Sequence, residues 1–160
     1  TICDIGEERI RRAGAKIKEE NPLTTLNLDT GFKVFRLDST NIVPWNNAEK
    51  LDEMRLYDYA KTIKDGRDDL SVAYEIMLKY GVFDKPMKET VVSGKKMYDV
   101  GEGYMIICLA DGVTMTDVEA IARLNPHCVV FKESGFADDN EKINATHTLE
   151  RGDVEKILCI

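Results

Sequence analysis

Residues 104–160 read YMIICLADGVTMTDVEAIARLNPHCVVFKESGFADDNEKINATHTLERGDVEKILCI, and this stretch decides the fold. Three short apolar runs stand out in it: Tyr104–Leu109, Cys128–Phe131 and Val154–Ile160. The first of them, Tyr104–Leu109, is nearly continuous, which is typical of a strand that is covered on both faces of a sheet. We therefore predict a strand at each run.

The two segments between these strands carry helix-start signals. Thr116 and Glu119 have the spacing of a capping box, which predicts a helix to about residue 124. Asp138 and Glu141 have the same spacing and predict a helix to about residue 149. The order strand, helix, strand, helix, strand predicts a parallel sheet with right-handed crossover connections.

The upstream segments are predicted from periodicity and turn chemistry. Charged residues four apart, such as Glu8 and Arg12, favour a helix, whereas alternating apolar residues favour a strand. A Ser-Gly pair supplies the positive φ angles of a hairpin turn. In chain order, we expect a helix over Glu7–Glu20, a strand over Gly31–Asp38, a helix over Ala48–Ile63, a helix capped by Asp68 or Asp69 and ended by Gly81, and a hairpin over Val91–Met97.

The composition and the net charge favour a single globular domain over a DNA-gripping domain or a membrane-spanning protein. The chain has 160 residues, of which 43% are hydrophobic, so it can bury the core of a single domain. Its net charge is -7, whereas a domain that grips DNA usually presents a basic face. No apolar run approaches the roughly 20 residues of a membrane span, and no signal peptide is recognisable. We expect a cytoplasmic protein with no membrane partner.

Five strings of residues form a pattern that runs from one end of the chain to the other. Thr1–Gly14 reads TICDIGEERIRRAG, and Gly31–Asn41 reads GFKVFRLDSTN. The pattern continues through Leu70–Gly81, Gly94–Leu109 and Val129–Ile160, the last of which contains VVFKESGFADD, KINA and KILCI. Together they resemble the C-terminal region of the modification subunits of type III restriction-modification systems, which are site-specific adenine DNA methyltransferases. The family versions of the first four strings read TI-DI-KERIRRA, GFKVFKLDSSN, DLLYEILLKYG and GKKVYSVGDGYLIVCL.

Two motifs of such methyltransferases are absent from this sequence. One is the (Asp/Asn/Ser)-Pro-Pro-(Tyr/Phe/Trp) loop, which hydrogen-bonds the target amino group. The other is the Phe-x-Gly-x-Gly turn that holds S-adenosylmethionine. The strings Asn21-Pro22-Leu23 and Asn125-Pro126-His127 lack the second proline and the aromatic residue. In the family both motifs lie N-terminal to the matched strings, so the resemblance implies that the chain is a C-terminal fragment of the enzyme.

The resemblance also divides the predicted α/β fold into two parts. Residues 1–41 correspond to a helix-strand remnant of the Rossmann-like methyltransferase core. Residues 42–160 correspond to a C-terminal α/β module with helices, a β-hairpin and the parallel β-α-β-α-β unit. The polar stretch Asn41–Asn47 is the expected boundary between the two parts.

Asp38 and Ser39 are the candidate cofactor-binding residues. If Gly31–Leu37 is the third strand of the methyltransferase core, both residues fall at a carboxyl end, where doubly wound folds bind ligands. The resemblance implies that they face the adenine end of S-adenosylmethionine in the intact protein. The sequence Asp-Ser-Thr-Asn is also typical of turns and helix caps, and this alternative stays open.

Acidic residues at the predicted strand ends indicate a rival site. Asp111, Glu133, Asp138 and Asp139 would cluster at the carboxyl edge of the parallel sheet, and such hard oxygen ligands suit a magnesium ion. A helix N-cap at Asp138 or Asp139 and an Asp-Gly turn at Asp111 explain these residues without a metal. We therefore expect neither a metal site nor a catalytic residue in this chain.

The other polar candidates have local explanations. Basic residues of the first helix alternate with glutamates, which favours a solvated, salt-bridged face over a phosphate-binding stripe. His127 and His147 adjoin no nucleophile pattern, whereas Lys142 and Asn144 fit a structural role as well as a functional one. Reduced thiols without metal-binding spacing are expected at the four cysteines, Cys3, Cys108, Cys128 and Cys159.

The expected function follows from the resemblance. The parent protein would transfer a methyl group from S-adenosylmethionine to the exocyclic amino group of adenine in a short DNA site, and would serve a restriction (helicase-nuclease) subunit. DNA would bind through the N-terminal part of the parent. The fragment alone is expected to be inactive and to hold no cofactor. It would brace the catalytic domain, form a homodimer or dock the restriction subunit. The alternative is a free-standing α/β domain that binds a metal or a nucleotide.

Overall fold

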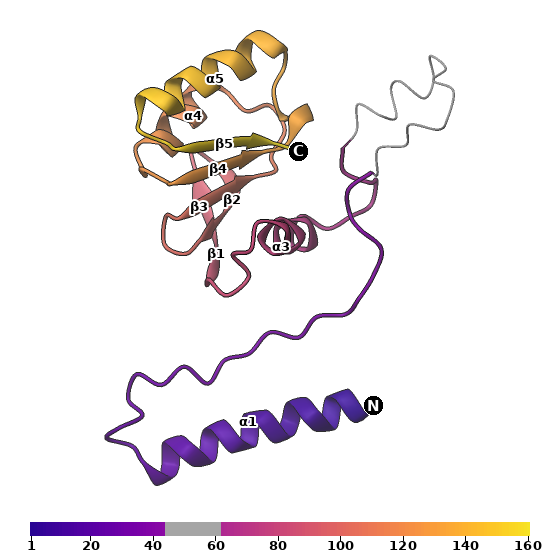
Figure 1. The fold of residues 1–160 in the computed structure, drawn as a ribbon, viewed down its shortest axis with the longest axis vertical. Coiled ribbons are helices and arrows are strands. Elements are labelled where there is room, and N and C mark those ends of the chain that lie inside the picture. The colour runs from indigo at the N-terminus through magenta and orange to yellow at the C-terminus, as the bar shows by residue number, and fades with distance from the viewer. Residues whose placement is uncertain (44–61) are drawn as a thin grey trace. The chain divides into compact units, whose positions relative to one another are not determined.

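The chain divides into two compact units. The computed structural model describes residues 1–43 and 62–160 (Figure 1). Residues 1–38 form unit 1, and residues 39–160 form unit 2. The division therefore falls just before the stretch Asn41–Asn47, where the sequence predicts a boundary.

Unit 1 begins with a long, solvated helix, α1 (Ile2–Glu20). Thr1 caps the helix in a capping box with Asp4, so α1 starts earlier than predicted. None of its residues is buried. The predicted salt bridges are confirmed: Arg12 contacts Glu8 at 2.7 Å, and the other pairs of this kind are Arg11–Glu7 and Lys16–Glu20.

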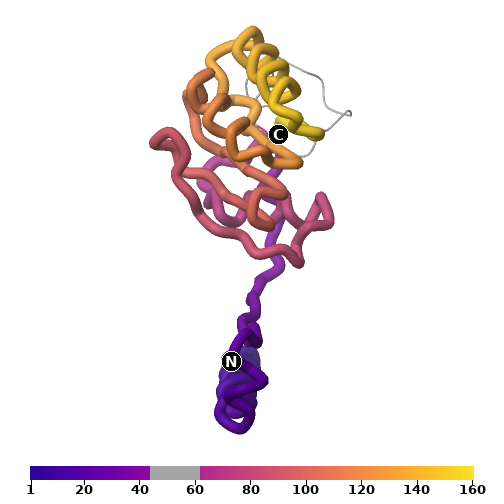
Figure 2. The backbone as a smooth tube through the Cα atoms, turned by 90° about the vertical axis from the view of Figure 1, so that its left-hand side faces the viewer, coloured from indigo at the N-terminus to yellow at the C-terminus, as the bar shows by residue number. Residues whose placement is uncertain are grey.

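The predicted strand Gly31–Asp38 is wrong. Residues 31–40 adopt neither helix nor strand, and between α1 and Asp38 the chain follows an irregular path (Figure 2). An alternating pattern becomes a strand only where a neighbouring strand completes its hydrogen-bond ladder, and unit 1 contains no strand. Phe32 instead lies under the Arg11 guanidinium, whose carbon is 5.5 Å from the ring centroid.

Unit 2 is built on a five-stranded mixed sheet in the order β1-β2-β3-β4-β5, which confirms the α/β fold class. The first three strands pair antiparallel, and the last three pair parallel as predicted. The predicted hairpin is also confirmed, because Ser93 and Gly94 form its turn with φ angles of 54° and 82°. The strands are β1 (Met87–Val92), β2 (Lys95–Val100), β3 (Met105–Cys108), β4 (Cys128–Phe131) and β5 (Lys156–Cys159).

Helices cover both faces of this sheet (Figure 1). Successive side chains of a strand point to opposite faces. In β3, Met105 and Ile107 accordingly pack with α3, while Ile106 and Cys108 pack with α4 and α5. The three helices are α3 (Asp69–Lys79), α4 (Met115–Ala122) and α5 (Asp139–Arg151), and a short 3-10 turn lies at Glu133–Gly135.

The sequence predicts caps for α3, α4 and α5, and two of these three predictions are confirmed. Asp68 caps α3 and Asp138 caps α5, each by accepting a backbone N–H from the third residue of the helix. The capping box predicted at Thr116 and Glu119 is wrong. The carboxylate of Asp117 instead accepts from the amide and hydroxyl of Thr114, both at 2.9 Å. The same sequence offers Thr-x-x-acid at both registers, and α4 begins at the earlier one.

Two remaining expectations concern the segment before α3 and the membrane. The predicted helix Ala48–Ile63 falls mostly outside the described residues. Its last residue, Ile63, is not helical, because it forms an antiparallel bridge with Ile42. Among the described residues, no helix combines the length and the apolar character that crossing a membrane requires.

Candidate functional site

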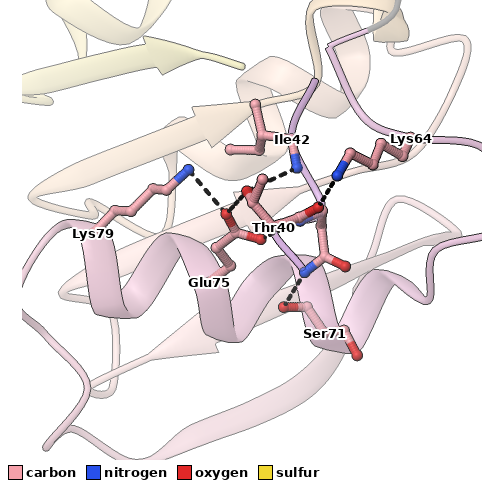
Figure 3. Close-up of polar contacts among 7 residues, drawn as sticks. Thr40, Ile42, Lys64, Ser71, Glu75 and Lys79 are labelled. Carbon is pink, nitrogen blue, oxygen red and sulfur yellow. Dashed lines mark hydrogen bonds and ion pairs between the residues drawn. The ribbon is translucent and has the colours of Figure 1, made fainter. Parts of the chain in front are cut away.

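The chain enters unit 2 through a short polar segment that is fixed on α3 (Figure 3). Thr40 and Asn41 lie against Glu75, which is in the middle of the helix. The Glu75 carboxylate accepts a hydrogen bond from the Thr40 hydroxyl and another, at 2.6 Å, from the Asn41 amide. It also pairs with the ammonium of Lys79 at 2.9 Å. One carboxylate thus joins residues more than thirty positions apart in the sequence.

These contacts shift the titration of Glu75. Partial burial of the carboxyl raises its pKa, but hydrogen bonds from Thr40, Lys79 and the Asn41 amide outweigh this effect and lower the pKa from 4.5 to about 2. The carboxylate is therefore charged at neutral pH. A charge that accepts three hydrogen bonds is a strong local anchor, because charge-assisted hydrogen bonds exceed neutral ones in strength.

A second chain segment joins the same assembly. The amide of Val43 donates to Thr62 O at 2.8 Å, and the amide of Lys64 donates to Asn41 O at 2.9 Å. The Lys64 ammonium reaches Thr40 O at 2.6 Å. The side chain of Asn41 donates to Ser71 O on α3 at 3.2 Å. Residues 39–43 and 62–64, which we call the strap, thus form a paired stem on α3.

The structure places Ser39 at the start of this strap, and Asp38 is the last residue of unit 1. They do not end a strand, so the geometric premise for a ligand at a carboxyl edge is absent. The Ser39 hydroxyl accepts a hydrogen bond from the Arg67 guanidinium, and Asp38 also has an interaction partner. Their assignment to S-adenosylmethionine stays a prediction about the intact protein.

The carboxyl edge of the parallel strands brings the acidic candidates next to lysines. Lys132 pairs with Asp111 at 2.8 Å. Lys142, in the first turns of α5, pairs with Glu133 and lies 3.7 Å from Asp139. Its hydrogen bond to Glu133 raises the pKa of Lys142. Three of the four acids that the sequence groups together as oxygen ligands, Asp111, Glu133 and Asp139, are therefore ion-paired.

Asp138 and Lys95 make further polar contacts at this edge. Asp138 uses its carboxylate as the α5 cap, accepting from the Glu141 amide at 2.8 Å. Lys95, from β2, donates to Asp111 O at 3.0 Å and lies 3.9 Å from the buried Asp117. Within residues 1–43 and 62–160, no three His, Cys, Asp or Glu side chains converge as metal ligands.

Sequence reasoning missed the lysines that pair with these acids. A signal was present, because Lys132 directly follows β4 and Lys142 lies four residues after the α5 cap. The carboxyl end of a parallel strand and the first turn of the following helix meet at one edge of the sheet. Cations at those two positions are therefore expected near the acids at Asp111 and Glu133.

The histidines and cysteines show no catalytic arrangement among the described residues. His127 stacks on Tyr104, with ring centroids 4.9 Å apart, and contacts Glu155. His147 contacts Glu150, and both lie on the exposed face of α5. All four cysteines are free thiols. Burial raises the pKa of the Cys108 and Cys128 thiols, which keeps them protonated and poorly nucleophilic.

Asn144 lies on the exposed side of α5, where it lines a shallow depression with His147, Glu150 and Arg151. The walls of this depression are side chains of one helix. No buried polar group contributes to it, since all four residues are exposed or half-exposed. Lys142, the other residue singled out in the KINA string, faces Glu133 instead.

No protein-family model matches this chain, and no curated protein matches it either.

Proposed function

We propose that this chain is the C-terminal region of the modification subunit of a type III restriction-modification system. The intact protein would transfer a methyl group from S-adenosylmethionine to the exocyclic amino group of adenine in a short DNA site. The observation that carries the proposal is the ordered resemblance of five strings, from Thr1–Gly14 to Val129–Ile160. Strings at separate positions that keep their order are more specific than any single motif.

In this proposal, the chain has a structural or partner-docking role. Its parallel strands end in the ion pairs Lys132–Asp111 and Lys142–Glu133, so both of these acids already have a lysine partner. The sheet is covered by α3 on one face and by α4 and α5 on the other. Such a module suits bracing of a cytoplasmic catalytic domain, self-association or docking of the restriction subunit. DNA would contact the N-terminal part of the parent, since the chain carries a net charge of -7.

The alternative is a free-standing α/β domain that binds a metal or a nucleotide at its carboxyl edge. Ligand oxygens at that edge would have to be released first. A magnesium ion would need Glu133 and Asp139 to exchange the Lys142 ammonium for the ion. This competition favours the structural role.

The coding sequence upstream of Thr1 provides the most direct test. The proposal requires a Pro-Pro-aromatic loop and a Phe-x-Gly-x-Gly turn in that sequence, and an open reading frame without them would contradict it. A second test is calorimetric titration of the chain with S-adenosylmethionine, magnesium ions and a nucleoside triphosphate. The proposal expects no measurable binding of any of the three. Micromolar binding of magnesium ions or the nucleotide would instead support the alternative.

A further inference from the structure

We infer that the strap, residues 39–43 with residues 62–64, can leave α3 without unfolding of the sheet. The Glu75 carboxylate is the group that holds the strap on α3. The inference rests on the contacts within unit 2 and is independent of the proposed function. Residues 39–43 begin unit 2, and contacts to α3 hold them in place.

The polar contacts of the strap converge on one group. Among the described residues, Glu75 accepts hydrogen bonds from both the Thr40 hydroxyl and the Asn41 amide, whereas Ser71 O accepts one from the Asn41 side chain. The Asn41 residue is 8% exposed, and the Glu75 side chain is 15% exposed. Removing the carboxylate would therefore leave a nearly buried amide without its acceptor, which is a costly state.

The strap has little apolar anchorage of its own. Ile63 is the strap residue that packs against the core on the α3 face of the sheet, and it does so while partly exposed. The fully buried residues of that core come from α3, from the strands and from the loops beside them, and none comes from residues 39–43. Loss of the polar anchor should thus release the strap while the sheet stays folded.

Residues 62–64 are held mainly by their pairing with residues 39–43. Residues 62–64 touch residues 39–43 through the Ile42–Ile63 bridge and through the Lys64 amide, which donates to Asn41 O. The Lys64 ammonium also donates to Thr40 O. When Thr40 and Asn41 leave α3, the acceptors for Lys64 leave with them. Both halves should therefore be released in one step.

Hydrogen exchange on the whole chain tests the inference. In Glu75→Ala, the amides of Asn41, Val43 and Lys64 should exchange at least about tenfold faster than in the wild type at neutral pH. The amides of β3 and β4 should keep their rates, because their core does not include the strap. Thr40→Val removes one of the two strap contacts to Glu75 and should give a smaller acceleration of the same three amides.

Glu119→Ala is the matched control, since it removes an exposed carboxylate that pairs with Arg123 on α4. It should leave all three strap amides unchanged. Unchanged strap exchange in Glu75→Ala would overturn the inference. Equal acceleration of strap and sheet amides in both Glu75→Ala and Thr40→Val would overturn it too, because Glu75 would then stabilise unit 2 as a whole.

Discussion

Glu75→Gln should weaken the attachment of the strap to α3 at neutral pH and leave it unchanged in strong acid. Each pKa unit is worth about 1.36 kcal/mol. The lowering of the Glu75 pKa from 4.5 to about 2 therefore sets a ceiling of about 3.4 kcal/mol on the loss. Glu75 is 15% exposed and its partner Lys79 is 51% exposed, so solvent screens part of the interaction. We expect a loss of about 1–2 kcal/mol in the free energy of releasing the strap from α3.

The sign of the pH dependence follows from the direction of the pKa change. Glu75 has the lower pKa in the folded state, so its charge stabilises the protein above about pH 4.5, and this contribution is lost as the pH falls toward about 2. Glutamine cannot ionise. The free energies of strap release in wild type and variant should therefore differ most near neutral pH and converge in acid.

Hydrogen exchange of the strap amides at a series of pH values, corrected for the pH dependence of intrinsic amide exchange, measures this difference. Glu119→Gln is the control. It alters an ion pair with Arg123 whose side chains are 56% and 76% exposed, and it should cost less than about 0.5 kcal/mol. The reasoning fails if the Glu75 variant loses the same free energy at about pH 3 as at about pH 7. It also fails if the control loses as much as Glu75→Gln does.

Three further predictions concern packing, the carboxyl edge and unit 1. Leu149→Ala empties a fully buried site between α5 and the sheet and should cost about 2–5 kcal/mol in thermal unfolding; a cost below about 1 kcal/mol would mean that the site collapses. A double-mutant cycle of Lys142→Met and Glu133→Gln should give a coupling of about 0.5–1 kcal/mol; Lys88 and Glu102, an exposed pair, should couple more weakly. Deletion of residues 1–38 should leave a cooperative unfolding transition and reduce self-association in sedimentation experiments; loss of the transition would show that unit 2 needs unit 1.

The parallel part of the fold could be predicted because local signals agreed with one another. Apolar runs at β3, β4 and β5 are long enough for a strand and too short for a buried helix, and the α5 cap at Asp138 lies between two of them. Likewise, the Ser93-Gly94 pair specifies the hairpin turn because both residues take positive φ angles there. Each of these features depends on residues that are close in sequence.

The failed predictions needed partners that are distant in sequence. Gly31–Asp38 has the alternation of a strand, but a strand also requires a neighbour, and unit 1 provides none. In α4, Thr114 and Asp117 form the capping box in place of Thr116 and Glu119. Local chemistry alone could not separate these registers.

The candidate site likewise has features that the sequence predicts and features that only the tertiary structure shows. The sequence by itself determined that Asp111 and Glu133 follow parallel strands and therefore share an edge of the sheet. Only the tertiary structure decided that Lys132 and Lys142 neutralise them, and that Glu75 holds Thr40 and Asn41 on α3. The physical reason is range: capping, turns and periodicity act over a few residues, whereas an ion pair or a strap forms only after the chain has brought distant residues within hydrogen-bonding distance.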